Sequence, residues 1–139
     1  MKWLRITTLV ILCLALQGCV YLPLPAKVVW GRKIQKADVT FVNVGATTRP
    51  EIVERFGAPD KVYTNPPVSV YWWLERTGYW AYGVPTEVGW AGDGGELNRT
   101  GVLLILFGAD ECVRKAEIRY APRTGVTQDF ITTWSAIDY

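Results

Sequence analysis

Apolar and polar positions alternate with the period of an α-helix in residues 49–56. Three apolar side chains fall on one face of such a helix and the charged side chains fall on the other; the apolar face consists of Ile52, Val53 and Phe56. Thr48 and Glu51 have the spacing of a capping box, in which each side chain accepts from the other residue's backbone N–H. The sequence therefore predicts a helix that begins at Arg49 and packs its apolar face on the rest of the protein.

The end of this helix is marked by Gly57 and Pro59. Glycine adopts positive φ without the steric cost that a Cβ brings, and proline cannot continue the helical hydrogen bonds. We therefore expect the helix to end at Phe56, with Gly57 in a left-handed cap conformation.

Three later segments have the pattern of β-strands. Residues 68–74 alternate between two series, one mainly aliphatic and one with aromatic side chains, which is typical of a strand with two different faces. Residues 101–107, G-V-L-L-I-L-F, form a continuous apolar run, as in a central strand that is covered on both sides. A turn-like sequence at 108–111 joins this run to residues 113–120, so these two segments are predicted to form a hairpin.

Residues 34–44 allow two interpretations. Their β-branched and aromatic side chains favour a strand, whereas apolar residues at intervals of three, four and three positions favour one face of a helix; these residues are Ile34, Ala37, Phe41 and Val44. The pattern alone leaves both open.

The flanking segments are predicted to be accessory. Residues 19–33 contain two prolines and no periodicity, so we expect a tether. Residues 121–139 are predicted to form a C-terminal tail with a short helix at 128–135, in which three apolar side chains share a face and dock on the domain; these are Phe130, Ile131 and Trp134.

Residues 76–100 are rich in Gly, Tyr and Trp and separate the first two predicted strands. This stretch is longer than an ordinary hairpin loop, and long loops in compact domains are commonly binding elements. Flat amphipathic rings suit contact with a partner protein, a glycan or a lipid interface; the candidate partner-binding residues are Tyr79, Trp80, Tyr82 and Trp90. The alternative is that these rings fold back and cover the open face of the sheet.

Residues 1–18 have the features of a secretory signal. Lys2 and Arg5 precede an apolar segment at 6–16, and the sequence L-Q-G-C then ends at Cys19. This ending resembles the lipobox of bacterial lipoproteins, which implies lipid attachment at Cys19 and removal of the preceding residues. The rival interpretation, a transmembrane anchor, is disfavoured because the apolar run is shorter than the roughly 20 residues that a span needs.

Composition narrows the function further. A chain of 139 residues has room for one domain with a core. Without Lys2 and Arg5 it carries 13 basic and 13 acidic side chains, which argues against nucleic-acid binding. Histidine is absent, so the commonest general base and metal ligand is missing. Cys112 would be the only cysteine left beside a lipidated Cys19 and is expected to be a packed small residue.

The stretch around the predicted helix resembles the signature of the BamE family, also called SmpA or OmlA, which are small lipoproteins of the outer-membrane assembly machinery. The matching positions are Gly45, Thr47, Glu51, Val53, Phe56, Gly57 and Pro59. The resemblance implies an α+β domain over residues 34–120, in which two short N-terminal helices pack on a three-stranded antiparallel sheet, as also in β-lactamase inhibitory proteins. It therefore supports the helical interpretation of residues 34–44.

Two functions are consistent with these features. The first is a lipid-anchored, non-catalytic protein-interaction module of the bacterial envelope, which the resemblance places at the outer membrane facing the periplasm, with the inner membrane or cell surface as alternatives. Its partners would be the membrane, through Cys19, and another envelope protein. The second is an inhibitor or a glycan- or peptide-binding lipoprotein that uses residues 76–100. Neither requires a catalytic residue, a metal or a cofactor.

Overall fold

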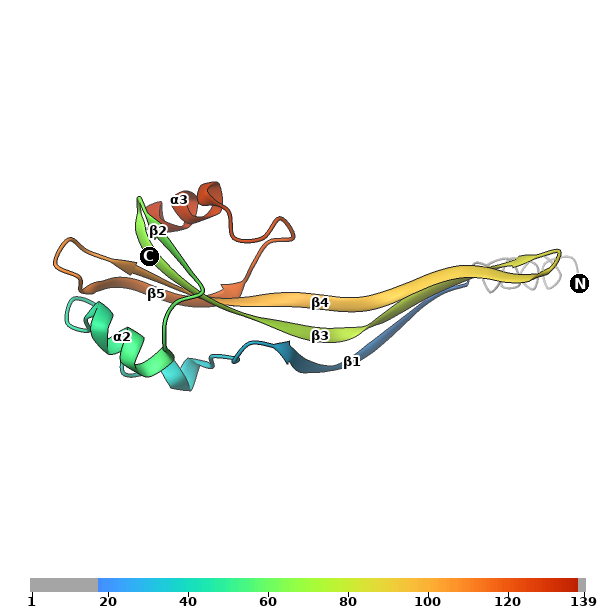
Figure 1. The fold of residues 1–139 in the computed structure, drawn as a ribbon, viewed down its shortest axis with the longest axis horizontal. Coiled ribbons are helices and arrows are strands. Elements are labelled where there is room, and N and C mark those ends of the chain that lie inside the picture. Colours follow the sequence, from blue (N-terminus) through green and yellow to red (C-terminus); the bar gives the residue numbers. More distant parts are fainter. Residues whose placement is uncertain (1–17, 138–139) are drawn as a thin grey trace, which may run out of the picture. The chain divides into compact units, whose positions relative to one another are not determined.

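The computed structural model describes residues 18–137 and consists mainly of β-structure (Figure 1). Five strands form one sheet in the order β1-β3-β4-β5, with β2 paired to β3 beside this path, and neighbouring strands are antiparallel. The elements in chain order are β1 (Gly18–Trp30), the 3₁₀ helix η1 (Lys36–Val39), α2 (Arg49–Phe56), β2 (Lys61–Thr64), β3 (Pro67–Thr86), β4 (Gly89–Phe107), β5 (Val113–Tyr120) and α3 (Gln128–Ala136). The predicted α+β domain, with two helices followed by three strands, is therefore wrong.

The described chain divides into two compact units. Unit 1 contains residues up to Lys27 together with Arg76–Asn98, and unit 2 contains Val28–Glu75 and Arg99–Tyr139. Strands β1, β3 and β4 each contribute residues to both units. Both buried clusters of the core lie in unit 2.

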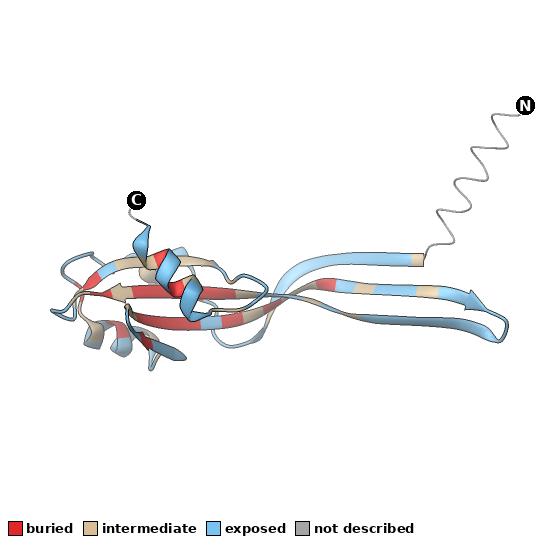
Figure 2. Ribbon diagram, turned by 90° about the horizontal axis from the view of Figure 1, so that it is seen from above, coloured by how far each residue is buried: buried red, intermediate tan, exposed pale blue. Residues whose placement is uncertain are grey.

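In unit 2, successive side chains of β4 point to opposite faces of the sheet, and both faces are covered. Leu103 and Ile105 lie in a cluster with Ile52 of α2, while Val102 and Leu104 lie in a second cluster with Trp134 of α3. The two helices accordingly lie on opposite sides of the sheet, and buried residues concentrate between them (Figures 1 and 2). The prediction of a doubly covered central strand over 101–107 is confirmed, as are the β4–β5 hairpin and the docked helix α3.

Helix α2 has the predicted bounds, and its first turn is held by Glu51, whose carboxylate accepts from the N–H of Thr48 at 2.7 Å and from its hydroxyl at 2.8 Å. Ile52 is fully buried beneath it. Gly57 follows with φ 86° and ψ −171°. The predicted positive φ is confirmed, but this ψ is extended, so the conformation is not that of a left-handed helix.

Two segments before α2 differ from the prediction. Residues 34–44 contain only the short helix η1, because the segment is anchored by single side chains such as Ile34 and not by a continuous helical face. Of residues 19–33, which were predicted to be a tether, 19–30 lie in β1, the strand at one end of the order β1-β3-β4-β5. Proline has no backbone N–H, so it fits a strand only where that position needs no partner strand. An edge strand has one unpaired side, and Pro23 and Pro25, two residues apart, present their nitrogens to the same side of β1.

The stretch predicted to be a long loop is instead strand. Residues 76–86 belong to β3 and 89–98 belong to β4, with only Glu87 and Val88 between the two strands. The glycines permit this pairing because they lie close to the backbone of the adjacent strand. A Cβ at Gly94, for example, would lie 2.9 Å from the carbonyl oxygen of Trp80. Regular pairing therefore overrides a composition that is typical of loops.

Candidate functional site

The four predicted contact residues all lie in unit 1, outside the two buried clusters. Trp90 is 74% exposed, Tyr82 47% and Tyr79 37%, while Trp80 is half-buried. Trp80 and Tyr82 are neighbours on one face of β3, with ring centroids 6.0 Å apart and planes only 7° apart. The structure thus brings two of the predicted residues into contact and leaves Trp90 the most accessible of the four.

Glycines make room for these rings. A Cβ at Gly95 would lie 3.0 Å from Nε1 of Trp80, and a Cβ at Gly83 would lie 3.4 Å from Cε3 of Trp90. Each indole therefore covers a glycine of the adjacent strand, an arrangement that shields the glycine backbone from water. The Gly-rich and Trp-rich composition of this stretch reflects cross-strand packing.

Unit 1 exposes many more apolar side chains than the sequence predicted. Nine of the seventeen exposed large hydrophobic residues lie in it: Val20, Tyr21, Leu22, Leu24, Tyr79, Tyr82, Val84, Val88 and Trp90. We call these nine residues and Trp80 the apolar ribbon. The four residues of β1 were missed because residues 19–33 were interpreted as a tether. The signal that could have found them is the apolar sequence V-Y-L-P-L directly after Cys19.

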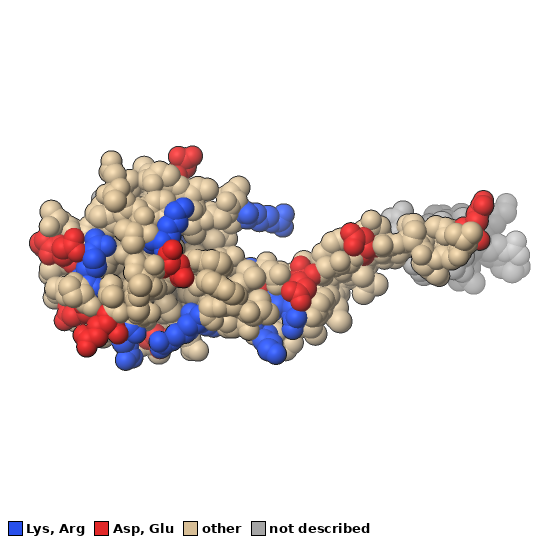
Figure 3. All heavy atoms as spheres, in the orientation of Figure 1, with Lys and Arg blue, Asp and Glu red and all other residues tan. Residues whose placement is uncertain are grey.

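Charged side chains are sparse on unit 1, whereas both signs are common on unit 2 (Figure 3). The charged residues of unit 1 within the described chain are Lys27, Arg76, Glu87, Asp93 and Glu96. Two of these neutralise each other, because Arg76 Nη1 lies 2.8 Å from Glu96 Oε1. The ribbon therefore has little charge with which to oppose burial against another apolar surface.

The sheet of unit 1 also has open edges. β5 pairs only with residues 101–107 of β4, so residues 89–98 have no partner on that side among the described strands. The outer edge of β1 is likewise unpaired within the described chain. Such edges present free backbone N–H and C=O groups that can pair with a further strand.

Cys19, the predicted lipid-attachment residue, is exposed and is the second residue of β1. The predicted signal at 1–18 lies outside the described residues except for Gly18. Cys112 is only half-buried and bridges to Thr48 through the backbone. None of the helices in residues 18–137 is long and apolar enough to cross a membrane, and the same residues contain no group of side chains arranged to hold a metal ion.

Unit 2 contains a buried carboxylate that the sequence did not predict. Glu75 is 1% exposed, and its oxygens lie 2.7 Å from Lys33 Nζ and 2.8 Å from Arg99 Nε, while the Trp73 indole N–H donates to it at 3.2 Å. Burial, the largest single influence, would raise the pKa of Glu75, but these hydrogen bonds and the charge of Lys33 together hold the pKa below its ordinary value. Glu75 is therefore a permanently charged structural group near neutral pH.

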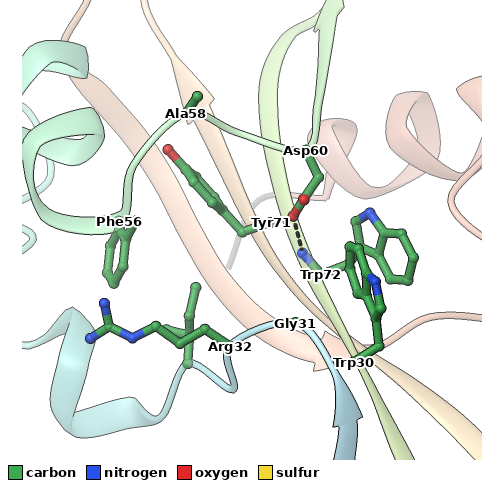
Figure 4. Close-up of a pocket in the computed structure, with 9 residues that line it drawn as sticks. Trp30, Gly31, Arg32, Phe56, Ala58, Asp60, Tyr71 and Trp72 are labelled. Atoms are coloured by element: carbon green, nitrogen blue, oxygen red, sulfur yellow. Dashed lines mark hydrogen bonds between the residues drawn. The ribbon is translucent and has the colours of Figure 1, made fainter.

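A small hollow of ≈ 140 Å³ lies in unit 2 beside the end of α2 (Figure 4). The Tyr71 hydroxyl donates to the carbonyl oxygen of Gly57 at 3.0 Å, and the N–H of Trp72 donates to Asp60 at 2.8 Å. Burial, and then the nearby charge of Asp60, raise the pKa of Tyr71 to about 12. These contacts fix the chain after α2 against β3, and the hollow is too small for an ordinary ligand.

Comparison of the chain with protein-family models, with characterised proteins and with solved structures gave no significant match.

Proposed function

We propose that the protein is a lipid-anchored, non-catalytic contact protein of the bacterial envelope, and that the apolar ribbon binds another envelope protein. The observation that carries this proposal is the concentration of exposed apolar side chains on the smaller of the two units. Contiguous exposed apolar surface on a folded protein generally marks an interaction site. Aromatic side chains add large contact area at a small cost in conformational entropy.

The open edges of β1 and β4 favour a protein partner over the hydrocarbon of a bilayer. Unpaired backbone groups are costly in hydrocarbon because nothing there can form hydrogen bonds with them. A partner that contributes a strand satisfies these groups, while its side chains cover the ribbon. A protein with an accessible strand is therefore the partner that fits both the faces and the edges.

The position of Cys19 supports attachment next to this surface. In the proposed mature chain Cys19 is the first residue, and β1 includes it. Two or more acyl chains on one residue hold a protein firmly on a membrane. With no spacer between the lipid and the first strand, unit 1 would meet its partner at the membrane surface.

Site-specific photo-crosslinking in intact membranes tests this proposal. A photoreactive phenylalanine derivative replaces Trp90 in one variant and Tyr82 in another, and the matched control carries it at Val44, which is 65% exposed in unit 2. We expect the two ribbon positions to crosslink to the same protein and the control position not to do so. The double substitution Tyr82→Ala with Trp90→Ala should reduce capture of that protein at least tenfold and lower the melting temperature only slightly, because neither ring belongs to a buried cluster.

Three results would contradict the proposal. Crosslinking to lipid alone would make the bilayer the occupant of the ribbon, and crosslinking to a second copy of this chain would make the ribbon a self-association surface. Equal crosslinking at Val44 would show that the ribbon has no special role. Separately, mass spectrometry that finds an unmodified Cys19 would exclude the proposed anchor.

A further inference from the structure

Part of the outer edge of β5 lacks a partner strand in the described chain. β5 is the last strand in the order β1-β3-β4-β5 and pairs with β4 on one side. Every second residue of an antiparallel strand directs both its N–H and its C=O away from the partner strand. Among the described residues, no segment besides β4 forms backbone hydrogen bonds with residues 116–120. This part of the edge can therefore accept a further strand.

The start of the same edge already pairs with a short piece of chain. The N–H of Val113 donates to the carbonyl oxygen of Thr47 at 2.8 Å, and the N–H of Gly45 donates to the carbonyl oxygen of Val113 at 2.7 Å. Before Gly45 the chain makes a turn, in which the N–H of Thr47 donates back to the carbonyl oxygen of Asn43 at 2.9 Å. The pairing therefore stops before it reaches residues 116–120.

A cleft of ≈ 580 Å³ adjoins the unpaired part of this edge. The lining residues are Lys33, Ile34, Gln35, Lys36, Trp73, Ile118, Arg119 and Tyr120. Ile34 and Trp73 belong to the buried cluster beneath α2, and Ile118 packs against that cluster, so the cleft lies on the α2 side of the sheet. Tyr120 shares this side because it follows Ile118 by two residues. Every second side chain of a strand added to β5 would therefore point toward the cleft.

The walls of the cleft are largely apolar and fixed in place. Trp73 packs over Gly101 so closely that a Cβ at position 101 would collide with the indole ring, and the indole N–H donates to Glu75 at 3.2 Å. Tyr120 is 48% exposed, and the guanidinium of Arg99 lies 4.1 Å from the centre of its ring. A flat apolar side chain such as that of phenylalanine would thus meet walls whose positions are set before it binds.

The charge at the cleft is positive. None of the lining residues is acidic, and Lys33 is paired with Glu75. Among the described residues, no carboxylate forms an ion pair with Lys36. Arg119 supplies no charge here, because its guanidinium lies over the Phe130 ring on the α3 side of the sheet. Lys36 is therefore the cation that an acidic side chain could pair with at this site.

We propose that this edge binds an extended peptide segment by strand addition, with one large apolar side chain in the cleft and an acidic side chain next to Lys36. In this mode backbone hydrogen bonds provide affinity, and a pocket for a side chain provides specificity. A second copy of this chain fits less well, because β5 carries three basic residues and one acidic residue, and two such strands would repel each other. This site is independent of the proposed function of the apolar ribbon.

Isothermal titration calorimetry tests the inference with the full-length chain in lipid nanodiscs, and titration of empty discs is subtracted. The probe is the peptide acetyl-Glu-Thr-Phe-Thr-Glu-amide, whose Phe and Glu side chains share one face of a strand. We expect saturable one-to-one binding, at least tenfold weaker when Ser replaces Phe. Lys36→Gln should weaken binding about threefold, as expected for a partly exposed ion pair. Lys61→Gln is the matched control and should leave the affinity unchanged, since Lys61 lies over the Tyr63 ring and does not line this cleft.

Two N-methylated peptides test the strand pairing itself. Alternate residues of a strand direct their N–H groups to opposite sides, so a methyl group on the Phe nitrogen and methyl groups on both Thr nitrogens block opposite edges of the peptide. One of these two peptides should lose binding and the other should keep it. Nuclear magnetic resonance should also show slower amide hydrogen exchange at alternate residues of 116–120 when the unmethylated peptide is bound.

Several results would overturn the proposal. Equal affinities for the two N-methylated peptides, or unchanged amide exchange at 116–120, would exclude strand addition. Unchanged affinity of the Ser peptide would exclude the cleft as the side-chain pocket, and unchanged affinity in Lys36→Gln would exclude the acidic contact. Protection of the outward-facing amides without peptide would show that the edge is already occupied, for example by a second copy.

Discussion

Replacement of Gly57 by alanine should destabilise the protein through the backbone alone. Gly57 has φ 86° and ψ −171°, a combination that is almost exclusive to glycine. A Cβ at this position would meet no other heavy atom within 4 Å, so no steric clash with neighbouring residues contributes. A residue with a side chain that is held in such a sparsely populated φ/ψ region carries about 1–3 kcal/mol of strain. We therefore expect Gly57→Ala to lower the free energy of unfolding by about 1–3 kcal/mol.

Relaxation of the backbone would not remove this cost. The N–H of Gly57 donates to the carbonyl oxygen of Val53 at 2.8 Å, and its own carbonyl accepts from the Tyr71 hydroxyl at 3.0 Å. Rotating residue 57 to negative φ would break one or both bonds, each of which contributes about 1 kcal/mol. The substitution is destabilising whether the chain remains strained or relaxes.

A double-mutant cycle with Tyr71→Phe distinguishes these two routes. The free energy of unfolding is measured by urea denaturation, followed by circular dichroism, for the wild type, both single variants and the double variant. If alanine holds the strained conformation, the two losses should add. If the chain relaxes and the Tyr71 bond is already lost, the double variant should be no less stable than Gly57→Ala. A loss smaller than about 0.5 kcal/mol for Gly57→Ala would refute the reasoning, because that is the ordinary range of a neutral surface substitution.

Two further predictions concern unit 2. Glu75→Gln should lower stability at pH 7 by about 2 kcal/mol, since charge-assisted hydrogen bonds from partly exposed partners are lost. The pKa of Glu75 in the folded protein lies below its ordinary value of 4.5, so the contribution of Glu75 to stability is present above pH 4.5 and disappears as the pH falls through the folded pKa. The urea midpoints of variant and wild type should therefore differ less at pH 3 than at pH 7. An equal or larger difference at pH 3 would contradict this. Trp134→Ala should lower the free energy of unfolding by about 3–5 kcal/mol, because this side chain is 1% exposed and its indole N–H donates to Glu117 at 2.6 Å. Thr133→Ala, on the exposed side of α3, is the control, and equal melting temperatures for these two variants would show that α3 does not stabilise the core.

The parts of the fold that could be predicted are those whose signals are local. The cap at Thr48 and the glycine at position 57 set the bounds of α2, and the continuous apolar run at 101–107 predicted a doubly covered strand. Strand β1 could not be predicted in this way, because its pairing partner lies about fifty positions later in β3 and its prolines suggest an irregular chain. The two-helix arrangement failed for a related reason, since residues 34–44 are held by tertiary contacts and not by a helical face.

The candidate sites also differ in whether their signals are local in the sequence. The rings of Tyr79, Trp80, Tyr82 and Trp90 marked this stretch as a candidate contact element, and three of them are exposed; the strand pairing that displays them was not predicted. The Glu75 cluster could not be predicted, because Lys33, Glu75 and Arg99 are far apart in sequence and meet only when the sheet forms. No local spacing rule connects such residues.

The packing of tryptophan on glycine limits how this sequence can change. Trp73 covers Gly101, Trp80 covers Gly95 and Trp90 covers Gly83, so that in each pair one residue occupies the space that the other leaves empty. A Cβ gained at Gly101 would collide with the Trp73 ring and one at Gly95 would crowd the Trp80 ring, whereas one at Gly83 would only touch the Trp90 ring at 3.4 Å. A ring lost at any of the three tryptophans uncovers a bare stretch of backbone. In related sequences the members of the Trp73–Gly101 and Trp80–Gly95 pairs should therefore be kept together or exchanged together. Such coupled changes in an alignment would indicate, without any structure, that the two residues are in contact.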